Sequence, residues 1–213
     1  MSQLARSGYV YLATSDVDAT HEDAFAHWSD EEWLPSLGRV SGVLSARRFV
    51  ALDGAPRHLT LCETATADAR RSGAIDTPGS AELRPHVRTR VGFYGQTYPA
   101  EGLFHGAAWS DGAAVPTAIL VIRLDIAPEH DEEFEEWYSQ EHLPALCGVS
   151  GVIGGRIFKA IAGGPKHMTI FHLAVPEGQA FDEWRRAAST PWTMRMRRPV
   201  PERWRVVYQP VVS

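Results

Sequence analysis

The sequence has few cysteines and no long hydrophobic run. Its 213 residues include two cysteines, Cys62 and Cys147, and their spacing fits neither a disulfide framework nor a zinc site. No apolar stretch reaches the length of about 18 residues that a transmembrane helix needs. Segment 1–15 also lacks the apolar core of a signal peptide. These absences argue against a helical membrane span and predict a protein of the reducing cytoplasm.

Basic charge and several short motifs are also missing. The formal net charge of −5 argues against a nucleic-acid partner, because phosphate contacts need a basic surface. No HExxH or CxxC suggests a metal, and no GxGxxG or phosphate-binding loop suggests a nucleotide. The GxSxG elbow of a serine hydrolase is absent as well. We therefore expect no cofactor and no metal, and a small molecule as the partner.

The chain does contain a long internal repeat. When residues 16–61 are aligned without a gap to residues 125–170, an offset of 109, 19 of the 46 positions are identical. Composition alone would give roughly 3 identities. Two copies of this period are too few for a solenoid, so each copy is predicted to be a domain-sized unit, and the two to be related by duplication. The expected domains are repeat 1 at 1–98, a linker at 99–117 and repeat 2 at 118–213.

Each copy has the same expected order of elements. In the second copy the hydrophobic pattern predicts strands at 118–126, 151–161, 167–175 and 203–211, and helices from Pro128 to near Pro144 and at 181–189. In the first copy it predicts strands at 9–14, 43–52, 58–64 and 88–98, and helices at 22–37 and near 67–72. This is the β-α-β-β-α-β order of the ferredoxin-like unit. The predicted fold is α+β, with two antiparallel four-stranded sheets that pack as an intramolecular α+β barrel.

The helix-to-strand segment carries a family resemblance. FEEWYSQEHLPALCGVSGVIGGRIF, residues 134–158, has an aromatic pair, then Glu-His-x-Pro, then a glycine before the next strand. It resembles the signature of the dimeric α+β barrel superfamily and, within it, the EthD-like branch. The first copy departs from this pattern, with Ser29 and Trp33 in place of the tyrosine and the histidine. The superfamily includes cofactor-free monooxygenases, lactone isomerases, polyketide cyclases, dehydratases and haem-degrading enzymes, and many members are homodimers.

The same helix supplies the candidate catalytic residues. At about 100° per residue, Phe134, Trp137, Tyr138 and Glu141 share one stripe, which places Glu141 among aromatic rings. Desolvation there favours the protonated carboxyl, so Glu141 beside His142 is a candidate acid/base pair. The alternative is a structural ion pair between Glu141 and Arg156, matched by Glu32 and Arg47 in the first copy. For His142 the alternative is a helix-terminal histidine that faces the last carbonyls.

Other polar residues are candidates for substrate binding. His58 and His167 occupy equivalent strand starts, and could belong to two similar sites or be polar residues of the fold. His172 lies an odd number of residues beyond His167, so the two side chains point to opposite faces and cannot easily chelate one metal. The substrate-binding set that we predict is Trp137, Arg156, His167, His172, His58 and Arg47.

Arginines are concentrated near the C-terminus, in segments 185–186, 195–198 and 203–205. They could hold a carboxylate or phenolate, or form a solvated basic face. The function that we predict is cofactor-independent acid/base catalysis of the lyase, isomerase or cyclase type. His142, Glu141 and Tyr138 would act on a small aromatic, polyketide-like or lactone-like compound in an apolar cavity. A haem-binding protein, a cofactor-free monooxygenase and a non-catalytic ligand-binding or stress protein remain alternatives, and a homodimer is left open.

Overall fold

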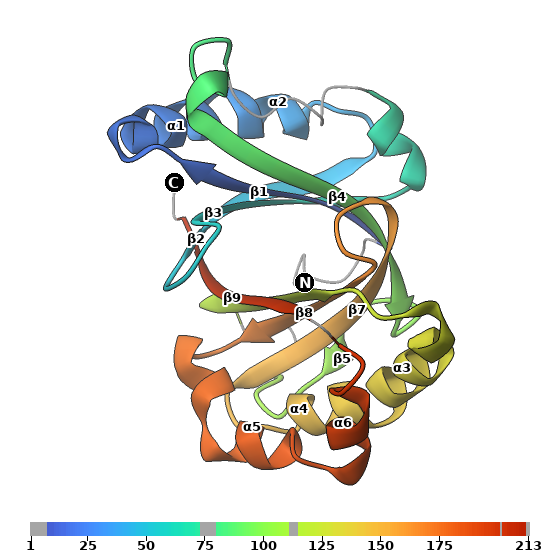
Figure 1. Ribbon diagram of the computed structural model, residues 1–213. Helices are drawn as coiled ribbons and strands as arrows, with labels where there is room; N and C mark the ends of the chain where they lie inside the picture. The colour runs from blue at the N-terminus through green and yellow to red at the C-terminus, as the bar shows by residue number, and fades with distance from the viewer. Residues whose placement is uncertain (1–7, 73–79, 111–114, 201, 212–213) are drawn as a thin grey trace. The chain divides into compact units, whose positions relative to one another are not determined.

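The computed structural model of the chain describes residues 8–72, 80–110, 115–200 and 202–211. Its contacts divide the chain into two compact units. Of the described residues, the first-repeat unit contains 8–72, 80–95, 160–164 and 208–211, and the second-repeat unit contains 96–110, 115–159, 165–200 and 202–207. Figure 1 shows both units, each with helices on one face of its strands.

The second-repeat unit has the strand order β9-β6-β8-β7-β5. Strands β6 (Ala118–Leu124), β7 (Val152–Gly163), β8 (His167–Leu173) and β9 (Arg203–Pro210) match the expected elements. The short strand β5 (Phe104–His105) lies in the expected linker and pairs with β7. This part of the linker therefore packs on the second-repeat unit.

The first-repeat unit repeats the same order with β4-β1-β3-β2. Its strands are β1 (Tyr9–Val17), β2 (Val43–Ala51), β3 (His58–Thr64) and β4 (Val87–Tyr98), and its helices α1 (Glu22–Trp28) and α2 (Leu34–Gly38). The second helical region reduces to the 3₁₀ turns η4 (Ala67–Ser72) and η5 (Arg84–His86). Both units therefore have the βαββαβ order, and the predicted α+β class is confirmed.

The long helix of each unit contains a π-helical turn. In the second-repeat unit α3 (Asp131–Trp137) continues through the π-helix η7 (Tyr138–His142) into α4 (Leu143–Cys147). The backbone N–H of Leu143 donates to the carbonyl of Tyr138, five residues back. The expectation that this helix ends near Pro144 is wrong. The π-turn ends at His142, and Pro144 lies in the first turn of α4, where a missing N–H is tolerated.

The helices beyond β8 were predicted only in part. Helix α5 (Asp182–Ala187) matches the expected one, whereas α6 (Pro191–Met196) was not predicted. The hydroxyl of Thr190 accepts from the backbone N–H of Thr193 and caps α6. A threonine followed by proline is a recognisable helix start, and the sequence does contain this signal.

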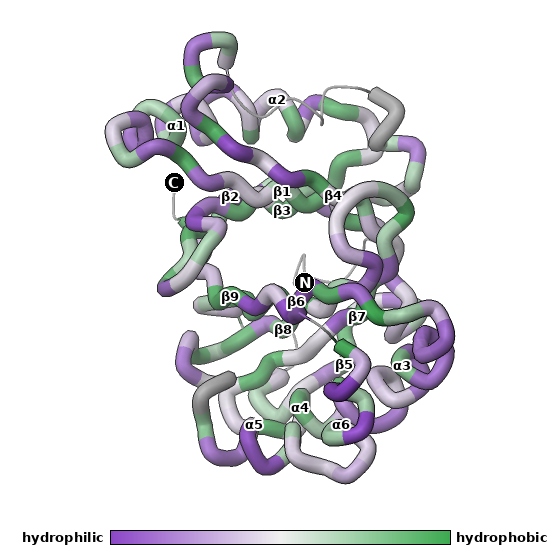
Figure 2. The backbone as a smooth tube through the Cα atoms, in the orientation of Figure 1, coloured by the Kyte–Doolittle hydropathy of each residue, from purple (hydrophilic) through white to green (hydrophobic). Residues whose placement is uncertain are grey.

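The core of the second-repeat unit lies between its strands and its helices. It is built from β6 residues such as Leu120 and Ile122, from Phe171 on β8 and from Trp137 and Leu146 on the helix. Figure 2 shows hydrophobic and hydrophilic residues in turn along the strands and a mainly hydrophilic region around α3. This core fixes the helix that carries the candidate residues.

Both cysteines are buried thiols, and burial raises the pKa of Cys62 and of Cys147 to about 12. Such thiols are unreactive at neutral pH. Among the residues that the structure describes, no helix is long and apolar enough to span a membrane.

Candidate functional site: an arginine-lined cavity of the second repeat

His142 is a buried imidazole held by two partners. Its ring stacks on the indole of Trp137, with centroids 4.2 Å apart and planes 28° apart. Its Nδ1 lies 3.3 Å from the hydroxyl oxygen of Thr193 on α6, and that oxygen also accepts from Nε1–H of Trp137 at 3.3 Å. Only 6% of the residue is exposed. These contacts fix the plane and the direction of the imidazole.

His142 lines a cavity of about 430 Å³ inside the second-repeat unit. The cavity lies among the long helix, α5, the end of α6, β6 and β9. Its apolar lining consists of Ile122, Leu146, Trp184 and Ala188. Its polar lining consists of His142, Ser189, Arg185, Arg197, Arg203 and Arg205. No carboxylate is among these residues, so the lining has a strong positive charge.

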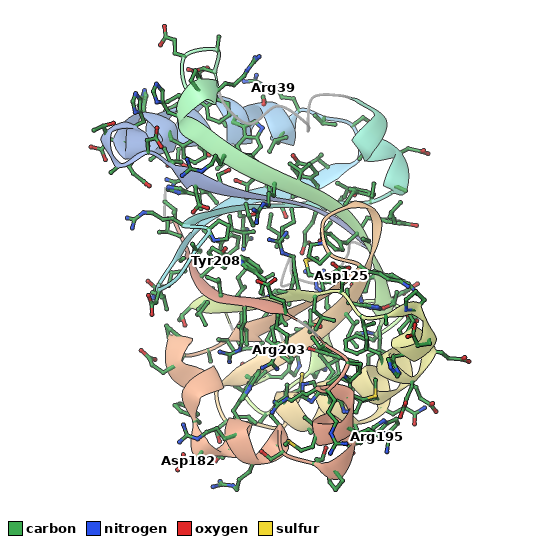
Figure 3. The ribbon with its side chains drawn as sticks, in the orientation of Figure 1. Arg39, Asp125, Asp182, Arg195, Arg203 and Tyr208 are labelled. Atoms are coloured by element: carbon green, nitrogen blue, oxygen red, sulfur yellow. The ribbon has the colours of Figure 1, made fainter. Side chains whose placement is uncertain are left out.

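The arginines differ in how they are paired. Arg185 forms an ion pair with Asp182, and Arg205 lies over the ring of Trp184 at 5.9 Å. The Nε of Arg197 is buried without a hydrogen-bond partner among the described residues. Burial, and then the neighbouring charge of Arg203, lower the pKa of Arg197. Arg203, labelled on β9 in Figure 3, adds a second cation to this end of the cavity.

Burial and charge keep His142 neutral. Desolvation is the largest cause, and the charges of Arg197 and Arg203 act in the same direction, so the pKa of His142 falls to about 3. At neutral pH the ring carries one proton, on Nδ1 or on Nε2. If Nδ1 carries it, Nδ1–H donates to Thr193 and the lone pair of Nε2 is free.

Glu141 does not lie on the aromatic face of the helix, where a regular α-helical spacing predicts it. The π-turn adds a residue between Trp137 and the next turn, so His142, not Glu141, reaches the aromatic side. Glu141 is half-buried, and its Oε1 accepts from the Thr190 hydroxyl at 2.5 Å. Thr190 is also the N-cap of α6. Glu141 therefore positions the helix that supplies Thr193 to the imidazole.

Tyr138 is fully buried beside His142. Its ring meets the imidazole edge-on, with centroids 5.0 Å apart. Burial raises its pKa to about 12, although a hydrogen bond with Thr169 opposes this. Tyr138 does not line the arginine-lined cavity; it lines a smaller one of about 210 Å³ that also includes His167. Tyr138 is therefore a protonated phenol that contacts the His142 ring but does not line the arginine-lined cavity.

His58 and His167 make the same contact in both units. Nε2 of His58 lies 2.7 Å from the Glu22 carboxylate, and Nε2 of His167 lies 2.7 Å from that of Asp131. Each acid is in the first turn of the long helix, and the two acids occupy equivalent positions at the offset of 109. This repeated tie between helix and strand supports the interpretation of these histidines as polar residues of the fold.

His172 and Arg156 lie on the other face of the sheet. Their neighbours Phe171 and Ile157 pack in the core under the helices, so alternation along each strand turns His172 and Arg156 away from it. Both are buried, and the Arg156 guanidinium lies 5.2 Å from the centre of the Phe158 ring. Neither lines the cavity that contains His142.

The matched ion pair expected of Glu32 with Arg47 gives way to another pair in the first-repeat unit. Arg48, the next residue, donates from Nε to Asp30 at 2.8 Å and from a second nitrogen to the same carboxylate at 2.5 Å. Arg47 and Glu32 are exposed. The second copy has Ile157 and Ser139 at the positions of Arg48 and Asp30, so this pair belongs to one repeat only.

Two clusters among the described residues have ligand types and spacing that a metal could use. One consists of Asp131, Glu135 and His167, the other of Asp18, His21 and His86. In the first cluster Lys166 donates to Asp131 at 2.7 Å, and Lys159 donates to Asp131 at 3.2 Å and also to Glu135. The ammonium groups of Lys159 and Lys166 thus bind the carboxylate oxygens that a metal ion would need. Burial alone would raise the pKa of Asp131, but these bonds and that from His167 outweigh it and lower it to about 2.

The residues of the site that the sequence did not predict are Trp184 and Thr193. The C-terminal arginines were predicted as a region that could hold a carboxylate or phenolate, but the pattern did not show that four of them line the cavity of His142. The long separation between residues 142 and 197–205 hides this meeting, since it depends on the unpredicted helix α6.

Comparisons with known proteins establish the fold. No protein-family model and no curated protein matches the chain. The chain is similar to a solved anthrone oxidase-like protein, with a TM-score of 0.70, 12% identity and coverage of 100% of this chain and 94% of that one. It is also similar to chlorite dismutase from Candidatus Nitrospira defluvii in complex with imidazole (TM-score 0.65, 14% identity, coverage 99% and 94%). A third match is a candidate monooxygenase from Lactobacillus acidophilus (TM-score 0.57, 11% identity, coverage 96% and 94%). At these identities the likeness shows the fold alone, an α+β fold whose two units each have the ferredoxin-like order of elements.

Proposed function

We propose that this protein is an enzyme that moves a proton on a small compound held in the arginine-lined cavity, with His142 as the general base and acid. The observation that carries the proposal is the position of His142: it lines the cavity, whereas the equivalent Trp33 is buried in the apolar cluster of the first-repeat unit. The reaction type is that of a lyase, isomerase or cyclase. The compound is aromatic, polyketide-like or lactone-like, and no cofactor takes part.

The proposed step uses the two nitrogens of His142 differently. A bound anion offsets the charges of Arg197 and Arg203 and so raises the pKa of His142 from its low value in the free protein. Nδ1–H then donates to Thr193, and Nε2 takes a proton from an acidic carbon or hydroxyl of the bound compound. The imidazolium then returns this proton to a second atom of the same molecule, so protons and charge balance over one turnover. Trp137 and Thr193 hold the ring plane, and Glu141 holds α6 through Thr190.

Proton exchange tests this proposal without knowledge of the natural substrate. The purified protein is incubated in D₂O with a panel of anthrones, aromatic ketones and lactones, and deuterium incorporation at the acidic carbon is followed by NMR. We expect catalysed exchange that falls about 10²-fold or more in His142→Gln. The control is His130→Gln, a half-buried histidine outside the cavity. Exchange that is unchanged in His142→Gln, or absent with every compound, would contradict the proposal.

A second candidate is a cofactor-free monooxygenase, supported by the likeness to the anthrone oxidase-like protein. It would begin with the same proton removal at Nε2 of His142. The resulting carbanion would add to dioxygen as co-substrate and take the proton back as a hydroperoxide, whose O–O bond then breaks so that one oxygen stays as a carbonyl and the other leaves as water. Oxygen consumption during the exchange experiment distinguishes the two: uptake in step with substrate loss favours the monooxygenase, and exchange without uptake favours the isomerase type.

The likeness to chlorite dismutase raises haem as an alternative. A macrocycle with both faces buried needs a mainly apolar lining. Here four of the ten lining residues are arginines, and Ile122, Leu146, Trp184 and Ala188 are the apolar ones. His167 is bonded to Asp131, and its cavity of about 210 Å³ is smaller still. The lining does not fit haem, and a haem titration without a Soret shift is the expected result.

The same proposal also covers the branch of the superfamily, the cellular location and the assembly of the chain. The Glu-His-x-Pro segment supports the EthD-like branch, and we include a cytoplasmic location and a homodimer of the full chain. Sedimentation velocity measures the assembly: a single species of twice the chain mass supports the homodimer, and a monomer at all concentrations contradicts it.

A further inference from the structure

We infer that the arginine-lined cavity is a binding site for an organic anion, whose carboxylate, phenolate or enolate oxygen is held by Arg197 and Arg203 while its hydrocarbon part lies on Trp184. This inference rests on the proposed function, since it names the substrate class of the same cavity. It assigns a recognition role to residues that the proton-transfer step does not use.

The first argument is an unmatched positive charge. Of the four arginines that line the cavity, Arg185 is paired with Asp182. Arg197 and Arg203 have no ion pair with another described residue, and no carboxylate lines the cavity. Two guanidinium groups crowded together without an acid repel each other, and an anion between them removes this repulsion.

The second argument is a buried donor without an acceptor. Nε of Arg197 is buried and has no hydrogen-bond partner among the described residues. A buried polar group of this kind costs free energy unless something satisfies it. The Nε atom itself is shielded from the cavity, but the same side chain lines it, so a ligand oxygen can accept from the other nitrogens of this guanidinium group.

The third argument is the apolar part of the cavity lining. Trp184, Ile122 and Leu146 give the cavity an apolar part, and the volume of about 430 Å³ is in the range of sites for small organic molecules. An inorganic anion would leave this apolar part unused. The combination of guanidinium groups with an indole suits a molecule that has an aromatic or alicyclic body and one anionic group.

Calorimetry with a matched pair of probes tests the inference. We would titrate the full chain with 1-naphthoate and with 1-naphthamide, which share the ring system and differ in charge. We expect naphthoate to bind at least tenfold more tightly than naphthamide, and to weaken as salt is raised from low to physiological concentration. Equal affinity for the two probes, or no binding of naphthoate, would overturn the inference.

Variants then locate the anion. Arg197→Gln and Arg203→Gln are each expected to weaken naphthoate at least tenfold while leaving naphthamide within twofold. The control is Arg198→Gln, an exposed neighbour that does not line the cavity. Circular dichroism and melting curves establish that the variants are folded, and the salt dependence of the wild type tests the charge even if a variant is not. Naphthoate affinity unchanged in both variants would overturn the inference.

This experiment is independent of catalysis. Arginine-dependent binding of naphthoate without His142-dependent proton exchange supports the anion site and contradicts the proposed function. His142-dependent exchange with equal affinity for both probes supports the function and overturns the anion site.

Discussion

The imidazole of His142 stacks on the indole of Trp137 in the place where, in the first repeat, Trp33 stacks on Trp28. The ring centroids are 4.2 Å apart in the second repeat and 5.4 Å apart in the first. The stacking position is thus common to both repeats, but only the second places a titratable ring there. In the first repeat Trp33 packs with Leu37 in an apolar cluster. The two repeats therefore share the ring stack on the long helix and differ in the chemistry of its second ring.

His142→Trp makes the second repeat resemble the first. We expect a folded protein, because the larger ring can stack on Trp137 as Trp33 does on Trp28, but with the cavity partly filled. Affinity for 1-naphthoate should fall at least tenfold, as measured by calorimetry. His142→Gln is the comparison, since it removes the imidazole without filling the space. Unchanged binding in His142→Trp would mean that the ligand lies elsewhere.

Acid should destabilise the protein partly through His142. The unfolded histidine titrates near its ordinary pKa of 6.5, whereas the folded one stays neutral down to about 3. Between these values the unfolded state binds more protons, so stability is full above pH 6.5 and falls as pH decreases through this window. The slope is about 1.4 kcal/mol per pH unit for one group.

Denaturant unfolding at pH 7 and pH 5 measures this slope. Burial also lowers the pKa of His58 and of His167, so they add to the same trend. The informative quantity is the difference between wild type and His142→Gln, which should lose less stability on acidification. Equal losses in the two proteins would show that His142 is not buried as a neutral ring.

Glu141 should act through Thr190 and not on the substrate. Thr190→Ala removes the cap of α6 and the hydroxyl that donates to Glu141, at a cost of about 1 kcal/mol in unfolding free energy. It should also loosen Thr193, so that proton exchange shows a pH profile shifted from that of the wild type. Thr190→Ser keeps the hydroxyl and should restore both. A serine variant as impaired as the alanine variant would contradict this positioning role.

The histidine and acid that tie helix to strand should matter for stability alone. Asp131→Asn weakens the contacts with two ammonium groups and with the His167 ring, and is expected to cost about 2 kcal/mol of unfolding free energy. Naphthoate binding should stay within twofold, because Asp131 does not line the cavity. Glu22→Gln is the equivalent change in the first repeat. A large loss of binding in Asp131→Asn with stability intact would give His167 a part in the site.

The repeat explains why much of the fold could be predicted. Alternation and apolar runs located all eight main strands, and the comparison of the copies singled out His142 against Trp33. The stripe containing Glu141 was misplaced because its helical spacing assumed 3.6 residues per turn, while the π-turn at 138–142 adds a residue. The partners Arg197 and Arg203 could not be assigned to His142, because their meeting depends on packing between distant segments.

The pKa of His142, measured by NMR on the selectively labelled imidazole with and without 1-naphthoate, tests the central claim most directly. Burial lowers this pKa most, followed by the charges of Arg197 at the end of α6 and Arg203 on β9. Arg185 and Arg205 line the same cavity, and the phenol of Tyr138 contacts the ring. The account predicts a pKa well below 6.5 in the free protein that rises when the anion neutralises the charges of Arg197 and Arg203. An imidazole that titrates near 6.5 and does not respond to naphthoate would contradict it.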